Sequence, residues 1–319
     1  MMQNSHDRFT NVYYRLGFCS IRKRCRSPGE KMLKEIVDVF MMLDDPNING
    51  EKVRQFFLER GHNRAEVRRT GGDEGLAEFI KIIVPGRSGK LIGGSSPTLG
   101  IIGRWDGSAP GKTGALSDAD GVIASLAIAL RLTEMAGEDD APYGDVIVST
   151  FLCYNALASD HNTASFLGSQ IDMEAMNEIG VDPEMDTIIS IGAAKGNRIT
   201  SVRGFAITPV IREGCILPLP DGVIDVLQKS TRTGTDVICI TSHDMEPYGG
   251  QNSINSILQP NTATSAGVMG VAIQPEDVVP WSSAWAMHVV NVAGACTFCI
   301  EIAKSYGSMK LKFFLMRLI

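Results

Sequence analysis

From residue 32 onward, apolar positions follow two repeats, one typical of amphipathic helices and the other of buried strands. Residues 32–41 place Leu33, Ile36, Val37, Phe40 and Met41 on one face of a helix. The helical repeat predicts further helices at 50–60, 73–83, 120–136, 172–179, 222–230 and 288–305. Short apolar runs predict strands at 65–69, 99–102, 146–152, 187–191, 199–210, 236–241 and 267–273.

Strands that alternate with helices and read as unbroken apolar runs predict an α/β fold. We expect a three-layer α/β/α arrangement with a mostly parallel central sheet and the 146–152 strand at its centre. One domain is expected over residues 32–305. Residues 1–31 are predicted to be a disordered or non-native basic extension, and residues 306–319 a basic and apolar tail. Ligands of such folds bind at the carboxyl ends of the strands.

The charge and cysteine content narrow the range of partners. The chain has a net charge of −6, but residues 1–31 carry seven Lys/Arg against two Asp/Glu, so that segment is +5 and the remainder is −11. An acidic body argues against nucleic acid as the main partner. No apolar stretch approaches the roughly 20 residues of a membrane span. Seven cysteines without a dense framework are typical of reduced thiols, so we expect a cytoplasmic protein.

Residues 99–121 combine a strand, a Gly-rich polar loop and the start of a long helix, and three interpretations compete. Gly111-Lys112-Thr113 resembles the end of a phosphate-binding loop, but Asp106 stands where that motif requires glycine. A metal site is the second interpretation, because three carboxylates in one connection (Asp106, Asp118 and Asp120) repel one another unless a cation screens them. The third is that Asp118 or Asp120 caps the helix.

The run from Asp106 through Gly114-Ala115-Leu116-Ser117-Asp118-Ala119-Asp120-Gly121 into a long helix resembles the di-zinc aminopeptidases. With Lys195-Gly196-Asn197-Arg198, Ser256–Pro260 and Thr262–Ser265, residues 32–305 also resemble the bacterial and archaeal family numbered 1177 among domains of unknown function. That family is itself similar to the aminopeptidase superfamily. The resemblance implies a zinc-exopeptidase-like fold, a divalent metal (zinc first) and hydrolysis of a small amide or peptide.

The resemblance also places His288, at the start of the last helix, where the peptidases have their final His ligand. The alternative is that His288 caps that helix or fills the core. Two further histidines follow strands beside carboxylates: His161 in Ser159-Asp160-His161 and His243 in Ser242-His243-Asp244. A solvated polar loop is the alternative for His161. The candidate metal ligands are therefore Asp106, Asp118, Asp120, His161, His243 and His288, and no catalytic residue is assigned.

Several positions depart from the peptidase pattern. Arg104 stands where a His ligand is expected, and arginine cannot bind a metal. Gly192 stands where a metal Asp is expected, and no Glu-Glu pair follows the 146–152 strand. Two hypotheses remain open: a metal-dependent hydrolase with an altered site, or a non-catalytic small-molecule-binding or assembly protein on the same scaffold.

In either case Arg104, Lys195 and Arg198 are candidates to bind an anionic group of a small molecule or short peptide. We expect a homo-oligomer with no membrane or nucleic-acid partner. Two smaller expectations concern packing: Cys296 and Cys299 are predicted to lie in the core, and His62 at the surface.

Overall fold

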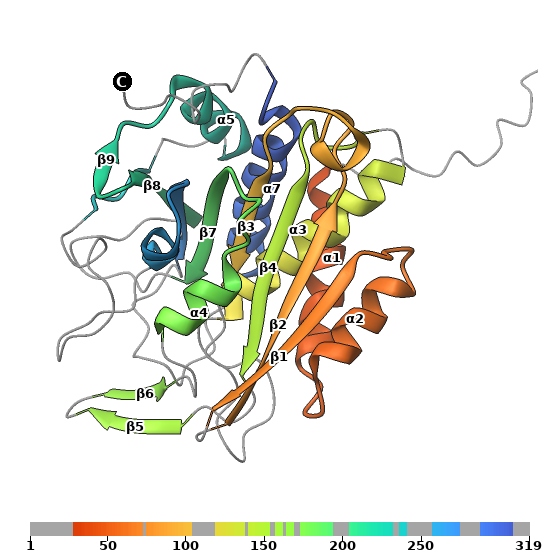
Figure 1. Ribbon diagram of the computed structural model, residues 1–319, viewed down its shortest axis with the longest axis vertical. Helices are drawn as coiled ribbons and strands as arrows, with labels where there is room; N and C mark the ends of the chain where they lie inside the picture. The colour runs from red at the N-terminus through yellow and green to blue at the C-terminus, as the bar shows by residue number, and fades with distance from the viewer. Residues whose placement is uncertain are drawn as a thin grey trace, which may run out of the picture.

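The computed structural model has three layers, with helices on both faces of one central sheet (Figure 1). This arrangement confirms the predicted α/β class. The structure describes residues 28–72, 75–103, 119–137, 140–153, 157–161, 164–168, 173–193, 204–231, 236–240, 257–274 and 288–308. No helix in these ranges is both long and apolar enough to cross a lipid bilayer.

Eight strands form the main sheet, in the order β1-β2-β4-β3-β7-β10-β8-β9. The central pairs β4–β3, β3–β7 and β7–β10 are parallel, and the strands outside them pair antiparallel. β10 lies between β7 and β8 although it follows both in the chain. The strands are β1 Ala65–Gly72, β2 Gly75–Val84, β3 Leu99–Gly103, β4 Val146–Cys153, β7 Thr187–Ala193, β8 Gly204–Arg212, β9 Cys215–Leu217 and β10 Gly267–Gln274. A separate hairpin pairs β5 (Leu157–His161) with β6 (Ala164–Gly168).

The helices divide between the two faces. On the rear face in Figure 1, α1, α3 and α7 pack against one another, α2 covers β1 and β2, and α5 lies beside α7. On the front face, α4 lies over β4 and contacts the short helix η2. The helices are α1 Pro28–Leu43, α2 Gly50–Leu58, η1 Lys90–Ile92, α3 Ala119–Gly137, α4 Met173–Gly180, α5 Asp221–Thr231, η2 Gln259–Ala263 and α7 Val289–Ser305.

The main core lies between the sheet and the rear helices. One continuous apolar cluster runs from Met32 in α1 to Tyr306, which follows α7 and is 1% exposed. It includes Cys296 and Cys299, as predicted. The front face has two smaller clusters, one around Ile102 and Ile188 and the other around Phe79 and Phe151. The rear face therefore supplies most of the apolar burial that stabilises the fold.

Two predictions about secondary structure were wrong, because the residues concerned form paired strands. Residues 73–83 were expected to be helical, but residues 75–84 form β2, which pairs with β1 and β4. Ser159-Asp160-His161 was expected in a loop, but these residues pair with β6. The strand predicted at 236–241 is reduced, among its described residues, to an isolated bridge between Ile207 and Val237.

Two predictions about burial were also wrong. The inward face of α1 consists of Met32, Ile36, Val39 and Leu43, whereas Leu33, Val37 and Met41 are exposed. The buried set follows the helical spacing i, i+4, i+7 and i+11, so the helix is rotated relative to the predicted face. His62 is 4% exposed rather than at the surface, with its ring packed edge-on against Phe57.

Candidate functional site

The parallel strands β3, β4, β7 and β10 all end at one edge of the sheet. Their last residues are Gly103, Cys153, Ala193 and Gln274. Ligands of open α/β sheets bind at this carboxyl edge. The candidate residues are therefore best described by their position relative to this edge.

Asp120 lies in the first turn of α3, and that turn packs directly onto the end of β3. A Cβ atom built on Gly103 would lie 2.2 Å from the carbonyl oxygen of Gly121, so only glycine at position 103 allows the helix to come so close. The Asp120 side chain is 9% exposed. The amino end of a helix favours a carboxylate, because its amide groups carry partial positive charge.

His288 lies at the same edge, at the start of α7. It is the N-cap residue of that helix, its side chain is exposed, and it makes no capping hydrogen bond. The amide Nδ2 of Asn291 donates to the carbonyl oxygen of Gln274 over 2.8 Å, which holds the first turn of α7 against the end of β10. His288 therefore does not fill the core, and its imidazole points away from the packed interior.

The two helix starts are neighbours. β3 and β10 flank β7 on either side, so their ends are about 10 Å apart at the usual spacing between strands. Behind the sheet α3 and α7 are in direct contact, and the thiol of Cys296 points to the carbonyl oxygen of Ala124 at 3.6 Å. The fold thus brings Asp120 and His288, 168 positions apart in the sequence, to the same edge.

The other candidates are placed less fully. His161 is the last residue of β5 in the small hairpin, which lies apart from the main sheet in Figure 1. Asp106, Asp118, His243, Arg104, Lys195 and Arg198 lie outside the described residues.

The described part of the edge has the types of donor atom that bind a divalent metal, but too few of them to form a site. A carboxylate oxygen and an imidazole nitrogen are ordinary zinc ligands, and a catalytic zinc site uses three protein ligands. Within the described ranges, no group of three His, Cys, Asp or Glu residues comes together in a way that could hold a metal ion. Asp120 and His288 would therefore need ligands from the segments that follow the strand ends.

Gly192 lies on β7, one residue before the end of that strand, and is closely covered. A Cβ atom built there would lie 2.5 Å from Cγ2 of Ile257. No carboxylate side chain fits at this position while Ile257 packs over it. Position 192 is therefore closed to a longer side chain in this structure.

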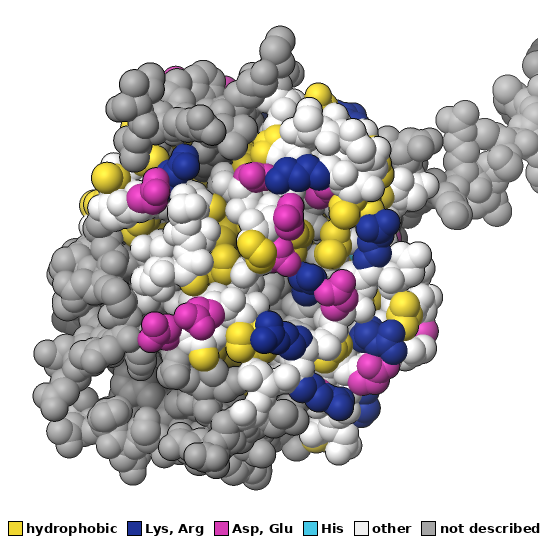
Figure 2. Space-filling view, in the orientation of Figure 1, with side chains coloured by type: hydrophobic (Ala, Val, Ile, Leu, Met, Phe, Trp, Pro, Cys, Tyr) yellow, Lys and Arg dark blue, Asp and Glu magenta, His cyan; other side chains and the backbone are white. Residues whose placement is uncertain are grey.

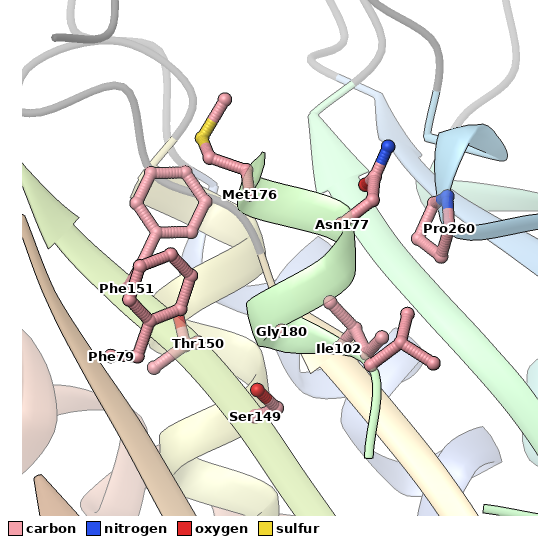
Figure 3. Close-up of a pocket in the computed structure, with 10 residues that line it drawn as sticks. Phe79, Ile102, Ser149, Thr150, Phe151, Met176, Asn177, Gly180 and Pro260 are labelled. Carbon is pink, nitrogen blue, oxygen red and sulfur yellow. The ribbon is translucent and has the colours of Figure 1, made fainter. Parts of the chain in front are cut away.

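A hollow on the front face contains none of the candidate residues. It lies between β4 and α4 (Figure 3), and its cavity volume is about 10 Å³, room for roughly one water molecule. Phe79 and Phe151 form one wall, with ring centroids 5.8 Å apart, and Met176 lies opposite on α4. Ser149, 4% exposed, contributes a hydroxyl. The only sequence signal was the polar pair Ser149-Thr150 inside an otherwise apolar strand.

Charged side chains on this face do not form a broad patch of one sign. Among the described residues in Figure 2, acidic and basic groups are interspersed. Lys81 illustrates the pairing, with its ammonium 2.9 Å from Glu66 and 3.3 Å from Asp182. Exposed pairs of this kind contribute little to stability.

Comparison with solved structures shows the fold. The chain is similar to the leucine aminopeptidase of Caenorhabditis elegans, with a TM-score of 0.52 and 9% identity over 88% of this chain and 67% of that one. A glutaminyl cyclase from an Acidobacteriales bacterium matches with a TM-score of 0.49 and 9% identity, covering 90% of this chain and 97% of that one. The bottromycin maturation enzyme BotP matches at 0.48 and 10% identity, over 84% and 70%.

Identities near 10% establish a shared architecture and no more. None of the curated protein sequences matches the chain. A family model described as "Protein of unknown function (DUF1177)" matches residues 68–317, which is most of the chain and runs from β1 past the end of α7. The chain therefore belongs to the DUF1177 family, as its sequence motifs had suggested.

Proposed function

We propose that this protein is a metal-dependent hydrolase of the peptidase or amidase type, with a metal site altered from that of the aminopeptidases. The observation that carries the proposal is the placement of Asp120, in the first turn of α3, and of His288, the N-cap residue of the adjacent α7, at the carboxyl edge. The shared architecture of an aminopeptidase supports it, since the same edge is the general ligand-binding position of α/β sheets.

The proposed ligands are Asp106, Asp118, Asp120, His161, His243 and His288, with zinc as the first metal to test. A divalent cation held by such a set supplies Lewis acidity that activates water toward an amide carbonyl. Asp120 is well suited to hold a cation because burial at 9% exposure limits competition from solvent. The exposed imidazole of His288 is free of any capping bond and so is available as a ligand.

The proposed substrate is a small amide or short peptide, with Arg104, Lys195 and Arg198 as candidates to bind an anionic end of it. Guanidinium groups bind carboxylates through paired hydrogen bonds, which would orient the substrate. We also propose a cytoplasmic location and a homo-oligomeric state, as expected from the sequence.

A second function is favoured by one observation, the contact of Ile257 over Gly192. If the loss of that ligand position has removed metal binding altogether, the protein would bind a small anionic molecule without catalysis. Arg104 would then occupy the place of the first metal and pair with a carboxylate of the ligand.

Metal content separates the two functions. We expect the full-length protein, purified without chelators and titrated with Zn²⁺, to retain about one equivalent after desalting. Asp120→Ala and His288→Ala should each lower retention at least ~10-fold, as expected when a ligand of a small set is lost. Asp225→Ala is the matched control, since it removes an exposed carboxylate on α5, and it should retain the metal fully.

Hydrolysis of an aminoacyl nitroanilide by the zinc-loaded protein, lost in both variants, would support the hydrolase. Retention below about 0.2 equivalents would exclude it. In that event the binding function predicts that a dicarboxylate stabilises the protein against heat, and that Arg104→Ala removes the effect. Absence of both responses would exclude both functions.

A further inference from the structure

Glu35 is a buried carboxyl group in the layer of rear helices. It lies on α1 among Met32, Ile36 and Val39, none of which is more than 2% exposed, and is itself 2% exposed. α1 packs against both α3 and α7 at this level. Among the described residues, the Oε2 atom of Glu35 has no hydrogen-bond partner. A charged carboxylate in this position would keep one buried oxygen without a hydrogen-bond partner, which is costly.

The groups that face Glu35 come from both neighbouring helices. From α3, Glu134 places a second carboxyl group within hydrogen-bonding reach, and Arg131 lies nearby. The guanidinium of Arg131 is 3.3 Å from a carboxylate oxygen of Glu134. From α7, the thiol of Cys296 lies close enough to feel the charge of Glu35. Glu35 therefore faces one acid, one thiol and a cation that already contacts the other acid.

These surroundings favour a proton on Glu35. Burial raises the pKa of Glu35 to about 7 and the carboxyl group of Glu134 acts in the same direction, while a backbone hydrogen bond and, least of all, Arg131 oppose them. Below about pH 4.5 the carboxyl is neutral in both the docked and the separated state of α1. Between about pH 4.5 and 7 a separated α1 releases the proton and a docked α1 keeps it, so docking weakens as the pH rises.

The construction of the fold lets α1 respond on its own. α1 contributes no strand to the sheet, so it can move from α3 and α7 without breaking the hydrogen-bond ladder. Leu33, Val37 and Met41 on its outward side are exposed. The packing that attaches α1 to the core therefore comes from the side chains of its inner face. α3, in contrast, packs onto β3, β4 and β7 as well as onto its helical neighbours.

We propose that Glu35 is a proton-operated latch: α1 docks on α3 and α7 while Glu35 is protonated and loosens from them when Glu35 ionises beside Glu134. The proposal concerns the rear helices and is independent of any activity at the carboxyl edge. Its consequence is that the surface of α3 and α7 beneath α1 becomes more accessible as the pH rises from about 4.5 to 7.

Amide hydrogen exchange of the full-length protein tests the latch. After correction for intrinsic exchange rates, we expect local opening of residues 32–43 to rise roughly 30-fold between pH 5.5 and pH 8. Residues 120–135 of α3 should change much less. Glu35→Gln keeps the shape of the protonated acid and cannot ionise, so opening of α1 should then change less than about 3-fold. Glu178→Gln, an exposed acid on α4, should behave as the unmodified protein.

Glu134→Gln gives a second, independent arm. It keeps Glu35 but removes the neighbouring carboxyl that raises its pKa, so the opening transition should move to lower pH. The latch is refuted if Glu35→Gln keeps the pH dependence of the unmodified chain, or if α1 and α3 lose protection together. If Glu35→Gln fails to fold, an unshifted transition in Glu134→Gln refutes the proposal instead.

Discussion

The two faces of the sheet differ in how completely they are packed. Behind the sheet, one continuous cluster joins five helices to the strands, and polar groups trapped there, such as Glu35 and His62, are almost fully excluded from water. In front, two small clusters leave a hollow beneath α4 (Figure 3). The two faces of one sheet therefore differ in enclosure: the rear holds polar groups within a continuous apolar core, and the front keeps a small open hollow.

Two matched aromatic pairs give the largest test of this difference. Phe298 packs behind the sheet against Phe205 with ring centroids 5.6 Å apart, and Phe151 packs in front against Phe79 at 5.8 Å. We expect Phe298→Ala to lower the free energy of unfolding by about 4 kcal/mol, because the enclosed cavity cannot be refilled. Phe151→Ala should cost about 2–3 kcal/mol, because its space merges with an existing open hollow.

Urea denaturation with a constant slope against denaturant is the appropriate measurement for the aromatic pair. Equal losses of unfolding free energy in Phe298→Ala and Phe151→Ala would mean that the front face is packed as tightly as the rear.

The next effect in size is a pH dependence from His62. Burial lowers the pKa of His62 to about 4, and its Nε2 contacts the hydroxyl of Thr133. The unfolded chain takes up a proton near pH 6.5 and the folded chain does not, so stability present above pH 6.5 is lost as the pH falls toward 4. We expect His62 to contribute a loss of up to about 3 kcal/mol over this range, seen in the Glu35→Gln background, because Glu35 contributes with the opposite sign between pH 4.5 and 7.

His62→Gln should remove most of that slope, since an amide can still contact Thr133 but does not titrate in this range. Thermal denaturation followed from pH 4.5 to 7 decides the point. An unchanged slope in His62→Gln would show that the rear face admits a charged imidazole.

The smallest expected effect comes from adding a methyl group beside the hollow. Gly180 and Gly137 are each the last residue of a helix. A Cβ atom on Gly180 would contact Ser149 Oγ at 3.9 Å and Phe79 Cε1 at 4.0 Å, whereas one on Gly137 would meet nothing within 4 Å. We expect Gly180→Ala to stabilise the protein by about 1 kcal/mol, from helix propensity plus contact.

Gly137→Ala should gain about half as much, since it has the propensity contribution alone. A difference in melting temperature between the two alanine variants measures the contact. If Gly180→Ala destabilises the protein, the hollow is already filled on average.

The sequence was informative where a strand is buried on both faces and short. The runs at 99–102, 146–152 and 267–273 all became central strands, since continuous apolar residues are what a covered parallel sheet requires. The same property misled at β2. Leu76, Phe79, Ile80 and Ile83 fall at i, i+3, i+4 and i+7, which imitates a helix, whereas the strand sends Phe79 to the front cluster and Ile80 to the rear one.

Burial of individual side chains was harder to predict. The apolar residues of α1 cover too wide an arc for periodicity to select its inner face. The charged residue Glu35 lies on the face that is buried, which made that face look exposed in the sequence. For the site, strand order could not be derived from spacing, so the expected position of His288 near Asp120 rested on the family resemblance and on the rule that strand ends share one edge. The structure then placed both at one edge, through the contacts of Gly103 and Asn291.

The insertion of β10 between β7 and β8 has a consequence for how the chain is made. Synthesis runs from the amino end, so β7 and β8 emerge before the strand that must separate them. The last helix, α7, and Tyr306 beyond it then complete the rear core against strands produced much earlier. The complete sheet therefore cannot be assembled strictly in the order in which its strands are synthesised. Until β10 is synthesised, the edges of β7 and β8 that it pairs with in the finished sheet lack their final partner.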